Sequence, residues 1–504
     1  MFTLSNIYKK LPPVLLLVHL ILGLLFCMYV AWMTDSLGGD TLEHMHVSWL
    51  VYAKFIPYKD FFQHHNPLLW YMFAPVLGLY TKGVSINLIT STVISAAILA
   101  SFINYLYLYL ITSRFLTTKF GGVVAAAIAF TPYIVLSVIH FRPDNFMMTS
   151  FFAGLYYYFC YIEKKRLGTL CLSFILFWCS FMFLQKIVFT LLLVGFITIY
   201  LIYKKIMKLS DVLYAAMLPA VLSIGFAAYL YHHDILDIWY KSNFTFNLHI
   251  PELFDDNRRL GVIWIELKCL LLGSTLAIIF CSKRSNIYFK ILVIIFCVEA
   301  VQRLFYFSAF AYYFYLLVYT ASILTAYFLT DKIFAKWWWL TYVLAVALGI
   351  SMYKPEIYNG NIGNRVNRFY HPLHEQITKK INPCDYVLNG DGSIYNIFNR
   401  DPHYYWNLLG QLDVIGAKVG IRPLMNINRV IEVYKPKIIF GKIYYDKYAK
   451  EHGQDVIVHE PDMELIEKYY KPMESPEGLY ILKPEFAPAK CEYDYKKRYY
   501  HAYD

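Results

Sequence analysis

The hydrophobic residues of this chain come in blocks of about 20, which recur from residue 13 to about residue 353. A block of that length crosses the ~30 Å hydrocarbon core of a bilayer as one helix. The pattern predicts an all-α polytopic membrane domain over residues 1–353, with about eleven transmembrane helices. Their expected positions are 13–33, 84–112, 120–139, 145–162, 168–184, 187–203, 211–231, 264–281, 287–306, 310–330 and 337–353.

Residues 354–504 follow a different pattern. Short β-rich runs at 437–440, 456–458 and 479–482 alternate with helix-like segments, and turn-forming clusters such as 389–392 (NGDG) separate them. These residues predict a small soluble α/β domain that follows the membrane domain.

Basic residues are grouped in short connections between the apolar blocks. They recur at every second connection, which assigns those connections and the N-terminus to the cytoplasm by the positive-inside rule. Parity then puts the C-terminal domain on the outer side, periplasmic or extracellular. The groups are Arg114 and Lys119; Lys164, Lys165 and Arg166; Lys204, Lys205 and Lys208; Lys283 and Arg284; and Lys332 and Lys336.

Composition supports a multi-pass protein of the cytoplasmic (inner) membrane. Charged residues make up 16% of the 504 residues, where a soluble protein carries roughly a quarter. The net charge of +11 comes from the loop lysines and arginines, so it does not indicate nucleic-acid binding. Cys384 and Cys491 lie in the outer domain, where a disulfide between them and two free thiols are both compatible with the sequence.

The expected outer connections, 35–83, 140–144 and 232–262, hold most of the candidate functional residues. The long first loop contains an amphipathic stretch, 41–54, that predicts a helix lying along the membrane surface.

At the start of this predicted helix, Asp40, Glu43 and His44 share one side. Asp40 either caps the helix or acts as a base that takes a proton from an acceptor hydroxyl. The sequence alone leaves both roles open.

Further cations follow in the same loop. Lys59, His64 and His65 are candidates for binding an anionic phosphate, and packing at the membrane interface is the alternative. A divalent metal held together with His44 and His46 is compatible with these residues. No spacing demands one, so no cofactor is required.

The other outer connections carry charges as well. Arg142 and Asp144 either pair at a helix end, or Asp144 faces the same cavity as Asp40. Lys186 lies at a tight outer turn, where a lysine holds a phosphate or extends to the interface.

Glu299 and Arg303 lie four residues apart inside an apolar span, where ionisable groups face a cavity or each other. A structural ion pair is the first expectation, and phosphate binding by Arg303 is the second. Arg258 and Arg259 are ordinary loop charges unless their loop folds over a lipid phosphate.

Several of these motifs resemble those of one family. Residues 39–44 (GDTLEH), 57–62 (PYKDFF) and 65–68 (HNPL) resemble the long first periplasmic loop of the GT-C glycosyltransferases. The closer similarity is to the bacterial branch related to protein O-mannosyltransferases and to the aminoarabinose transferase of lipid A. Residues 141–144 (FRPD) resemble the second acidic loop of that family, and 185–186 (QK) resemble its next short loop.

The resemblance extends in topology over residues 10–350. It implies an enzyme that transfers a sugar, hexosyl or pentosyl, from a polyprenyl-phosphate donor to a hydroxyl, usually with inversion. The expected partners are that donor, membrane lipids and a cell-envelope acceptor, which is a lipid, a glycan such as lipopolysaccharide, or a protein.

By the same resemblance, Asp40 is the general base or positions the acceptor, and Asp144 is the second acid of the cavity. Lys186 then lies near the donor phosphate, and His65 lines the cavity. One departure affects Glu43: many relatives have an acid directly after the first aspartate, whereas Thr41 follows Asp40 here.

Two other classes are compatible with a many-spanning chain. A transporter or flippase of lipid-linked sugars predicts ionisable residues near mid-membrane and matching repeated halves. A polysaccharide polymerase or ligase would rely on outer arginines and histidines. The concentration of polar residues in the outer loops, with no matching halves in the sequence, favours the glycosyltransferase.

Overall fold

In a computed structural model of the chain, contacts divide the protein into two compact units. The helical unit comprises Met1–Ser36, Ser91–Gly225 and Phe254–Gly363, and the loop–tail unit comprises Leu37–Thr90, Phe226–Leu253 and Asn364–Asp504. The structure describes residues 4–34, 39–116, 119–130, 139–250, 265–281, 286–305, 314–330, 340, 342–343, 377, 379–382, 384–388, 397–404, 415–416, 418–421, 427–440, 462–474 and 479–487.

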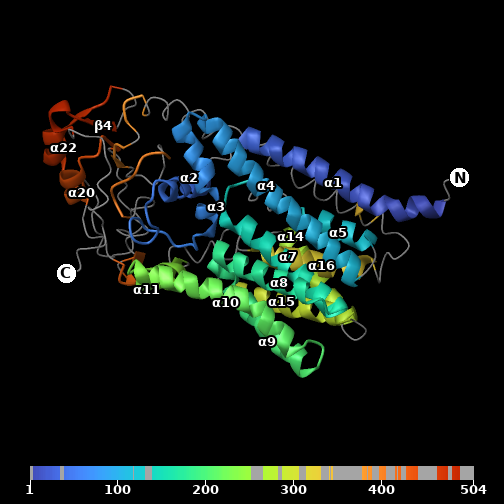
Figure 1. Ribbon diagram of the computed structural model, residues 1–504. Helices are drawn as coiled ribbons and strands as arrows, with labels where there is room; N and C mark the ends of the chain where they lie inside the picture. Colours follow the sequence, from blue (N-terminus) through green and yellow to red (C-terminus); the bar gives the residue numbers. More distant parts are fainter. Residues whose placement is uncertain are drawn as a thin grey trace. The chain divides into compact units, whose positions relative to one another are not determined.

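A helix occupies each of the first ten predicted spans, and the eleventh, 337–353, lies largely outside the described residues (Figure 1). Within the described part, Leu11–Met28, Ile86–Leu116, Gln185–Tyr203 and Leu209–His232 are long and apolar enough to cross a membrane. For the shorter helices a full crossing stays a prediction. The helices are α1 (Leu4–Thr34), α4 (Ile86–Ile111), α5 (Lys119–Ala129), α7 (Pro143–Lys164), α8 (Leu167–Phe183), α9 (Val188–Tyr203), α10 (Leu209–His232), α14 (Ile265–Cys281), α15 (Ile287–Phe305) and α16 (Tyr315–Phe328).

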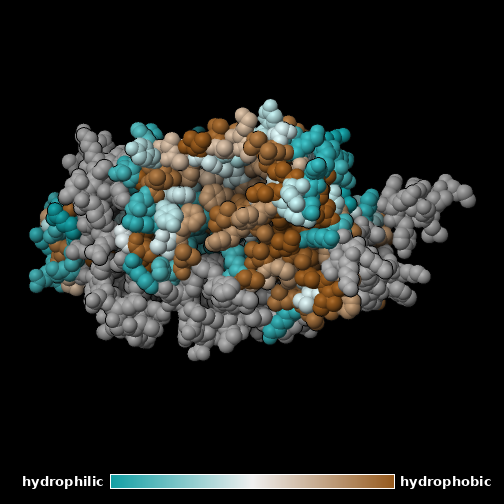
Figure 2. Space-filling view, turned by 90° about the horizontal axis from the view of Figure 1, so that it is seen from below, coloured by the Kyte–Doolittle hydropathy of each residue, from teal (hydrophilic) through white to brown (hydrophobic). Residues whose placement is uncertain are grey.

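Helix α16 forms the packed centre of the helical unit. It contacts α5, α14 and α15, and nearly all of its side chains are buried. By contrast, α9 and α10 expose large apolar side chains such as Phe196, Met217 and Val221. Figure 2 shows hydrophobic side chains gathered over the helices. An apolar surface of this extent on a folded protein requires a hydrocarbon environment.

The loop–tail unit begins with the long first loop, predicted as outer, which forms α2 (Gly39–Tyr52), α3 (Leu68–Gly78) and the 3₁₀ turn η1 (Leu79–Lys82). Helices α2 and α3 pack against each other. The segment after α10 adds α11 (Leu236–Tyr240), the π-helical turn η4 (Lys241–Thr245) and α12 (Phe246–His249).

The tail contributes a four-stranded sheet with the order β1-β2-β4-β3. Strand β1 (Val387–Leu388) runs parallel to β2 (Ile438–Phe440), and β4 (Leu479–Leu482) is antiparallel to β2 and to β3 (Tyr470–Pro472). The described tail also contains α20 (Ile427–Tyr434), α22 (Met463–Tyr469) and the 3₁₀ turn η9 (Pro484–Phe486).

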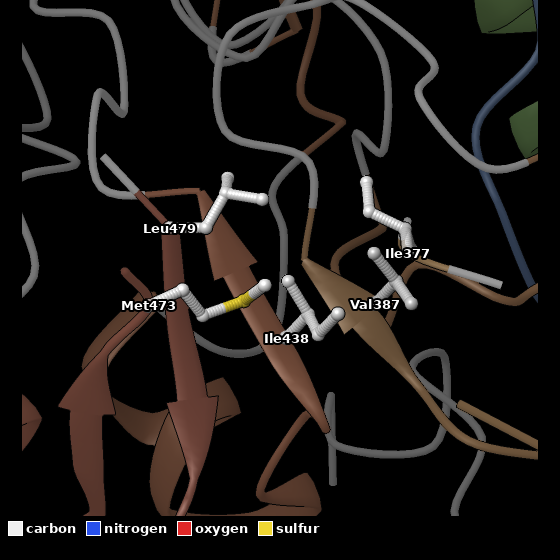
Figure 3. Close-up of a cluster of buried hydrophobic side chains, with 5 residues drawn as sticks. All are labelled: Ile377, Val387, Ile438, Met473 and Leu479. Carbon is white, nitrogen blue, oxygen red and sulfur yellow. The ribbon is translucent and has the colours of Figure 1, made fainter. Parts of the chain in front are cut away.

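This sheet confirms two of the predicted β-rich runs, 437–440 and 479–482, as neighbouring strands in which Ile438 pairs with Ile481. The third run, 456–458, lies outside the described residues. A small hydrophobic core holds the sheet together (Figure 3); its buried side chains are Ile377, Val387, Ile438, Met473 and Leu479.

Close packing of α4 and its continuation against α5 depends on a glycine. A Cβ atom at Gly122 would lie 2.7 Å from the backbone oxygen of Tyr109 and 3.0 Å from Cβ of Ser113. We expect Gly122→Ala to lower the free energy of unfolding by about 1–3 kcal/mol, because backbone atoms must move apart. Thermal denaturation of the purified protein in detergent measures this loss.

Gly195, in α9, is the matched control, since a Cβ atom there would meet no atom within 4 Å. Gly195→Ala is expected to leave the melting temperature unchanged or to raise it slightly, because alanine favours the helix. Equal melting temperatures for the two variants would contradict the close α4–α5 packing.

Candidate active site in the first loop

Helix α2 is buried on all sides. Every side chain from residue 41 to residue 50 is buried, including the polar Glu43, His44 and His46. The predicted helix is therefore confirmed, but the prediction that it lies along the membrane surface with one polar face is wrong. The reason is tertiary: α3 packs on α2, and the ring of Trp49 contacts Phe398 of the tail edge to face.

Asp40 differs from its neighbours because it is exposed in the first turn of α2. A carboxylate is favoured there by the positive end of the helix dipole. On the next turn Glu43 is buried, and its Oε1 atom accepts a hydrogen bond of 2.8 Å from Nε2 of Gln63. The structure thus holds Glu43 in place and leaves Asp40 accessible.

His44 is held by an aromatic partner of α3. Its Nδ1 atom accepts a hydrogen bond of 3.2 Å from the indole Nε1 of Trp70, so in the neutral ring Nε2 carries the proton. Its ring centroid lies 5.6 Å from that of His65, and the His65 ring lies 4.0 Å from that of His64. The structure therefore brings together the histidines from two separate motifs of the first loop.

The segment 56–65 forms a closed turn. The buried Tyr58 has a left-handed backbone (φ 67°), and its hydroxyl donates to the carbonyl oxygen of His65 at 2.5 Å. Oδ2 of Asp60 accepts from the backbone N–H of Ile56 at 2.7 Å, and the N–H of Tyr58 donates to the carbonyl of Phe61. Burial raises the pKa of the Tyr58 phenol, which stays a hydrogen-bond donor.

Residues of the tail form hydrogen bonds with the backbone of this turn. Arg400 donates from Nη2 to the carbonyl of Asp60 at 3.2 Å, although the two residues are 340 positions apart. The hydroxyl of Tyr404 donates to the carbonyl of Tyr58 at 2.9 Å, and the N–H of Phe62 donates to the carbonyl of Tyr404 at 2.8 Å.

The Arg400 side chain is 2% exposed, and its guanidinium lies 4.2 Å from the ring centroid of Phe55. Sequence reasoning missed Arg400 and Tyr404. The one signal was a run of charged and aromatic residues, 397–406 (IFNRDPHYYW), in an otherwise unremarkable tail.

The segment after α10 supports the same loop from another element. Nδ2 of Asn247 donates to the carbonyl of His64 at 2.9 Å, and Nε1 of Trp239 donates to Oδ1 of Asn66 at 3.0 Å. Lys59, predicted as a phosphate ligand, donates its ammonium to the carbonyl of His233 at 3.0 Å. The observed contact of Lys59 is therefore structural, and a phosphate would have to compete with it.

The remaining candidates lie in the helical unit. Nε of Arg142 lies 3.3 Å from Oδ2 of Asp144, and both side chains are buried. The predicted pairing at a helix end is confirmed, since Asp144 lies in the first turn of α7. Lys186 is partly buried in the 3₁₀ turn η3 (Gln185–Ile187) between α8 and α9, as predicted for a tight turn.

Glu299 and Arg303 form the predicted ion pair inside α15, with 3.3 Å between Oε2 and Nη2. The hydroxyl of Thr190, in α9, also donates to Glu299. Arg258 and Arg259 lie outside the described residues. Among the residues that the structure describes, no group of three or more histidine, cysteine, aspartate or glutamate side chains is placed to hold a metal ion.

Cys384 takes part in a disulfide bond. Cys491, with which the sequence left a disulfide open, lies outside the described residues.

Comparisons with known proteins find one matching family and several solved structures with a similar fold. A family model described as dolichyl-phosphate-mannose-protein mannosyltransferase matches residues 89–232. The archaeal oligosaccharyltransferase AglB from Archaeoglobus fulgidus, in complex with an inhibitory peptide and a dolichol-phosphate, has a similar structure with a TM-score of 0.53. Residues 89–232 are therefore similar to that mannosyltransferase family, and the chain as a whole has a fold similar to that of the oligosaccharyltransferase.

The structural similarity is extensive, although the sequences have diverged. The AglB match has 13% identity over 96% of this chain and 75% of that chain. A second structure, the A. fulgidus oligosaccharyltransferase tethered with an acceptor peptide containing the NVT sequon, matches with a TM-score of 0.51 and 14% identity over 96% and 76% of the two chains. No curated protein sequence matches the chain.

We expect Arg400→Met to release the turn 56–65, because the carbonyl of Asp60 loses a charged donor and the ring of Phe55 loses its cation. The expected loss in stability of the loop–tail unit is about 2–4 kcal/mol. Hydrogen exchange should quicken at the backbone amides of Tyr58 and Phe62. Arg429→Met is the control, since that arginine is exposed and its ion pair with Glu432 contributes little. Unchanged exchange in Arg400→Met would rule out this role for the tail.

His46 makes the stability of this unit depend on pH. Burial lowers its pKa from 6.5 to about 4, and Nδ1 donates to the carbonyl of Ile397 at 2.7 Å. Below pH 6.5 the His46 imidazole binds a proton in the unfolded chain but stays neutral in the folded chain. The free energy of unfolding therefore falls as the pH drops from 6.5 toward 4. Between pH 7 and pH 5 we expect a loss of roughly 2 kcal/mol.

His46→Asn keeps an N–H donor in a similar place and removes the titration. Melting temperatures of the two proteins from pH 7 to pH 5 should therefore diverge, with the wild type falling more steeply. Parallel curves would show that the titration of His46 does not cause the pH dependence of stability.

Proposed function

We propose that the protein transfers a sugar, with inversion, from a polyprenyl-phosphate donor to a hydroxyl of a cell-envelope acceptor at the outer face of the cytoplasmic membrane. The observation that carries the proposal is the exposed Asp40 at the start of α2, directly before a run of ten buried residues, 41–50. The similarity of residues 89–232 to the dolichyl-phosphate-mannose-protein mannosyltransferase family supports a lipid-linked donor.

The proposed step needs one base and several cations. Asp40 takes the proton of the acceptor hydroxyl as its oxygen attacks the anomeric carbon of the sugar. The bond between that carbon and the phosphate oxygen breaks, and polyprenyl phosphate leaves with the negative charge. Cations near the phosphate stabilise the charge as it develops.

Among the candidate cations, Lys186 is assigned first to the phosphate, because it is partly exposed at a turn between two helices. Arg142 is held beside Asp144, so this pair would place a second acid and a second cation at the start of α7. His65 is proposed to line the cavity. Lys59 and Arg303 are assigned weaker roles because both already bind protein oxygens. Arg258 and Arg259 stay predictions.

We propose that Glu43 does not transfer a proton and instead helps to hold α2 in position. It is 7% exposed and accepts a hydrogen bond from Gln63, which in turn accepts the backbone N–H of His64 through its amide oxygen. This chain of contacts links the helix that carries Asp40 to the histidine pair.

Two observations support an outer location for the tail. The tail and the first loop belong to one unit and share hydrogen bonds, so both lie on the same side of the membrane. The disulfide of Cys384 is the kind of bond that persists in an oxidising compartment such as the periplasm or the cell surface.

A transporter of lipid-linked sugars is the second candidate. The Glu299–Arg303 pair favours it, because buried ionisable groups within a membrane helix often mark a transport pathway. Its contact with Thr190 ties α15 to α9, which is equally compatible with a structural ion pair.

The test compares wild type, Asp40→Asn and Asp144→Asn in membranes at matched expression. Each receives radiolabelled polyprenyl-phosphate sugars and an extract of cell-envelope acceptors. We expect Asp40→Asn to reduce label transfer by about 10²–10⁴-fold, because the amide cannot accept the proton. Asp144→Asn is expected to lower transfer as well.

Asp237→Asn is the control, since Asp237 is an exposed carboxylate of the same unit, paired with Lys241. It should keep wild-type transfer. Full activity of a folded Asp40→Asn protein would refute the proposed base. Label that crosses between leaflets without transfer to any acceptor would favour the transporter.

A further inference from the structure

Two turns of the helical unit bring six basic residues together. The turn between α7 and α8 contains Lys164, Lys165 and Arg166, and the turn between α9 and α10 contains Lys204, Lys205 and Lys208. We call these residues, 164–166 and 204–208, the basic double turn.

Lys165 joins the two turns. Its ammonium donates to the carbonyl of Ile162 at 2.8 Å and to the carbonyl of Ile206, in the other turn, at 2.5 Å. A second link is the hydroxyl of Tyr161, which donates to Oδ2 of Asp211 at 2.7 Å. The turns therefore form one surface rather than two separate loops.

This surface carries positive charge that the described acidic residues do not neutralise. The five other cations are exposed, and none of them forms an ion pair with another of the described residues. The nearby acids have other partners: Glu163 pairs with Arg114 at 2.6 Å, and Asp211 accepts from Tyr161 and Ser210. Like charges on adjacent turns repel one another unless an anion lies between them.

The backbone of both turns shows that lysine is not the residue that the local conformation prefers. Lys165 (φ 53°) and Lys205 (φ 56°) each adopt the left-handed conformation. Glycine occupies that region without a steric penalty, whereas a side chain is disfavoured there. Lysine nevertheless occupies this position in both turns, which places a cation at the end of each of the two helices; Lys54 and Lys435 adopt the same conformation elsewhere in the chain.

Aromatic and apolar side chains lie directly beside the charges. The ammonium of Lys204 lies 5.7 Å and 5.3 Å from the ring centroids of Tyr200 and Tyr203. Farther along α9, Phe196 and Ile199 are 69% and 64% exposed, which gives acyl chains a surface to cover. Cations above exposed apolar side chains match a phospholipid, with phosphate at the turn and hydrocarbon along the helix.

We propose that the basic double turn is a binding site for anionic phospholipid, with the phosphate held by Lys204, Lys205 and Lys208 and by Lys164 and Arg166 of the other turn. The site is separate from the candidate active site and does not rest on the proposed transferase reaction. Its ligand is a lipid rather than a soluble anion, because the apolar side chains of α9 continue the surface.

The test uses native mass spectrometry of the purified full-length protein in detergent, titrated with dioleoylphosphatidylglycerol or dioleoylphosphatidylcholine. We expect the wild type to retain the anionic lipid at concentrations where it loses the zwitterionic one. Affinity for phosphatidylglycerol should fall about fivefold in Lys205→Gly, and about fivefold for each further cation removed by Lys204→Gln and Lys208→Gln.

Glycine suits the left-handed turn, so Lys205→Gly should preserve or raise the melting temperature. A loss of lipid binding in this variant therefore cannot result from unfolding. The control is Lys435→Gly, the same change at a left-handed lysine (φ 45°) beside the tail sheet, which should leave lipid retention unchanged. Equal phosphatidylglycerol retention by the wild type and by the variant that combines Lys204→Gln, Lys205→Gly and Lys208→Gln would overturn the proposal. Inorganic phosphate that displaces the lipid at millimolar concentration would overturn it too, since the site would then bind a soluble anion.

Discussion

The long first loop of this protein depends on hydrogen bonds that its own neighbours in sequence do not provide. Helix α2 is buried on all sides, and the turn that follows it hides polar backbone groups from water. A buried carbonyl or N–H without a partner costs about 1–3 kcal/mol, so such a turn persists only where partners are supplied. Arg400 and Tyr404 supply them from the tail, and Asn247 supplies another from the segment after α10.

The helical unit meets the same requirement differently. Its backbone is satisfied within each helix, which is the solution that a membrane imposes. The buried charges that remain are paired at short range, Arg142 with Asp144 at the start of α7 and Glu299 with Arg303 within α15. The exposed cations of the basic double turn form no ion pair with another described residue, and they lie at the ends of apolar helices, where we propose that an anionic lipid binds.

This arrangement bears on the base proposed for the reaction, Asp40. A general base contributes most when its position is fixed before the substrate binds. Asp40 begins a helix whose next turn is held by Gln63 and Trp70, so its backbone is fixed while its carboxylate stays accessible. The tail therefore acts on the candidate site by holding the loop beneath it, which explains why a domain remote in sequence belongs to the same unit.

The sequence by itself determined the helices of the membrane domain, the two adjacent strands of the tail, and the local pairs Arg142–Asp144 and Glu299–Arg303. These features depend on residues a few positions apart, and hydrophobic periodicity and helical spacing report such contacts directly. Only the tertiary structure decided that α2 is buried rather than lying at the membrane surface, that Lys59 binds a carbonyl oxygen, and that Arg400 holds the turn at Asp60. The physical reason is that these outcomes depend on which distant segment covers each polar group. Contacts across 340 residues leave no periodic signal in either segment.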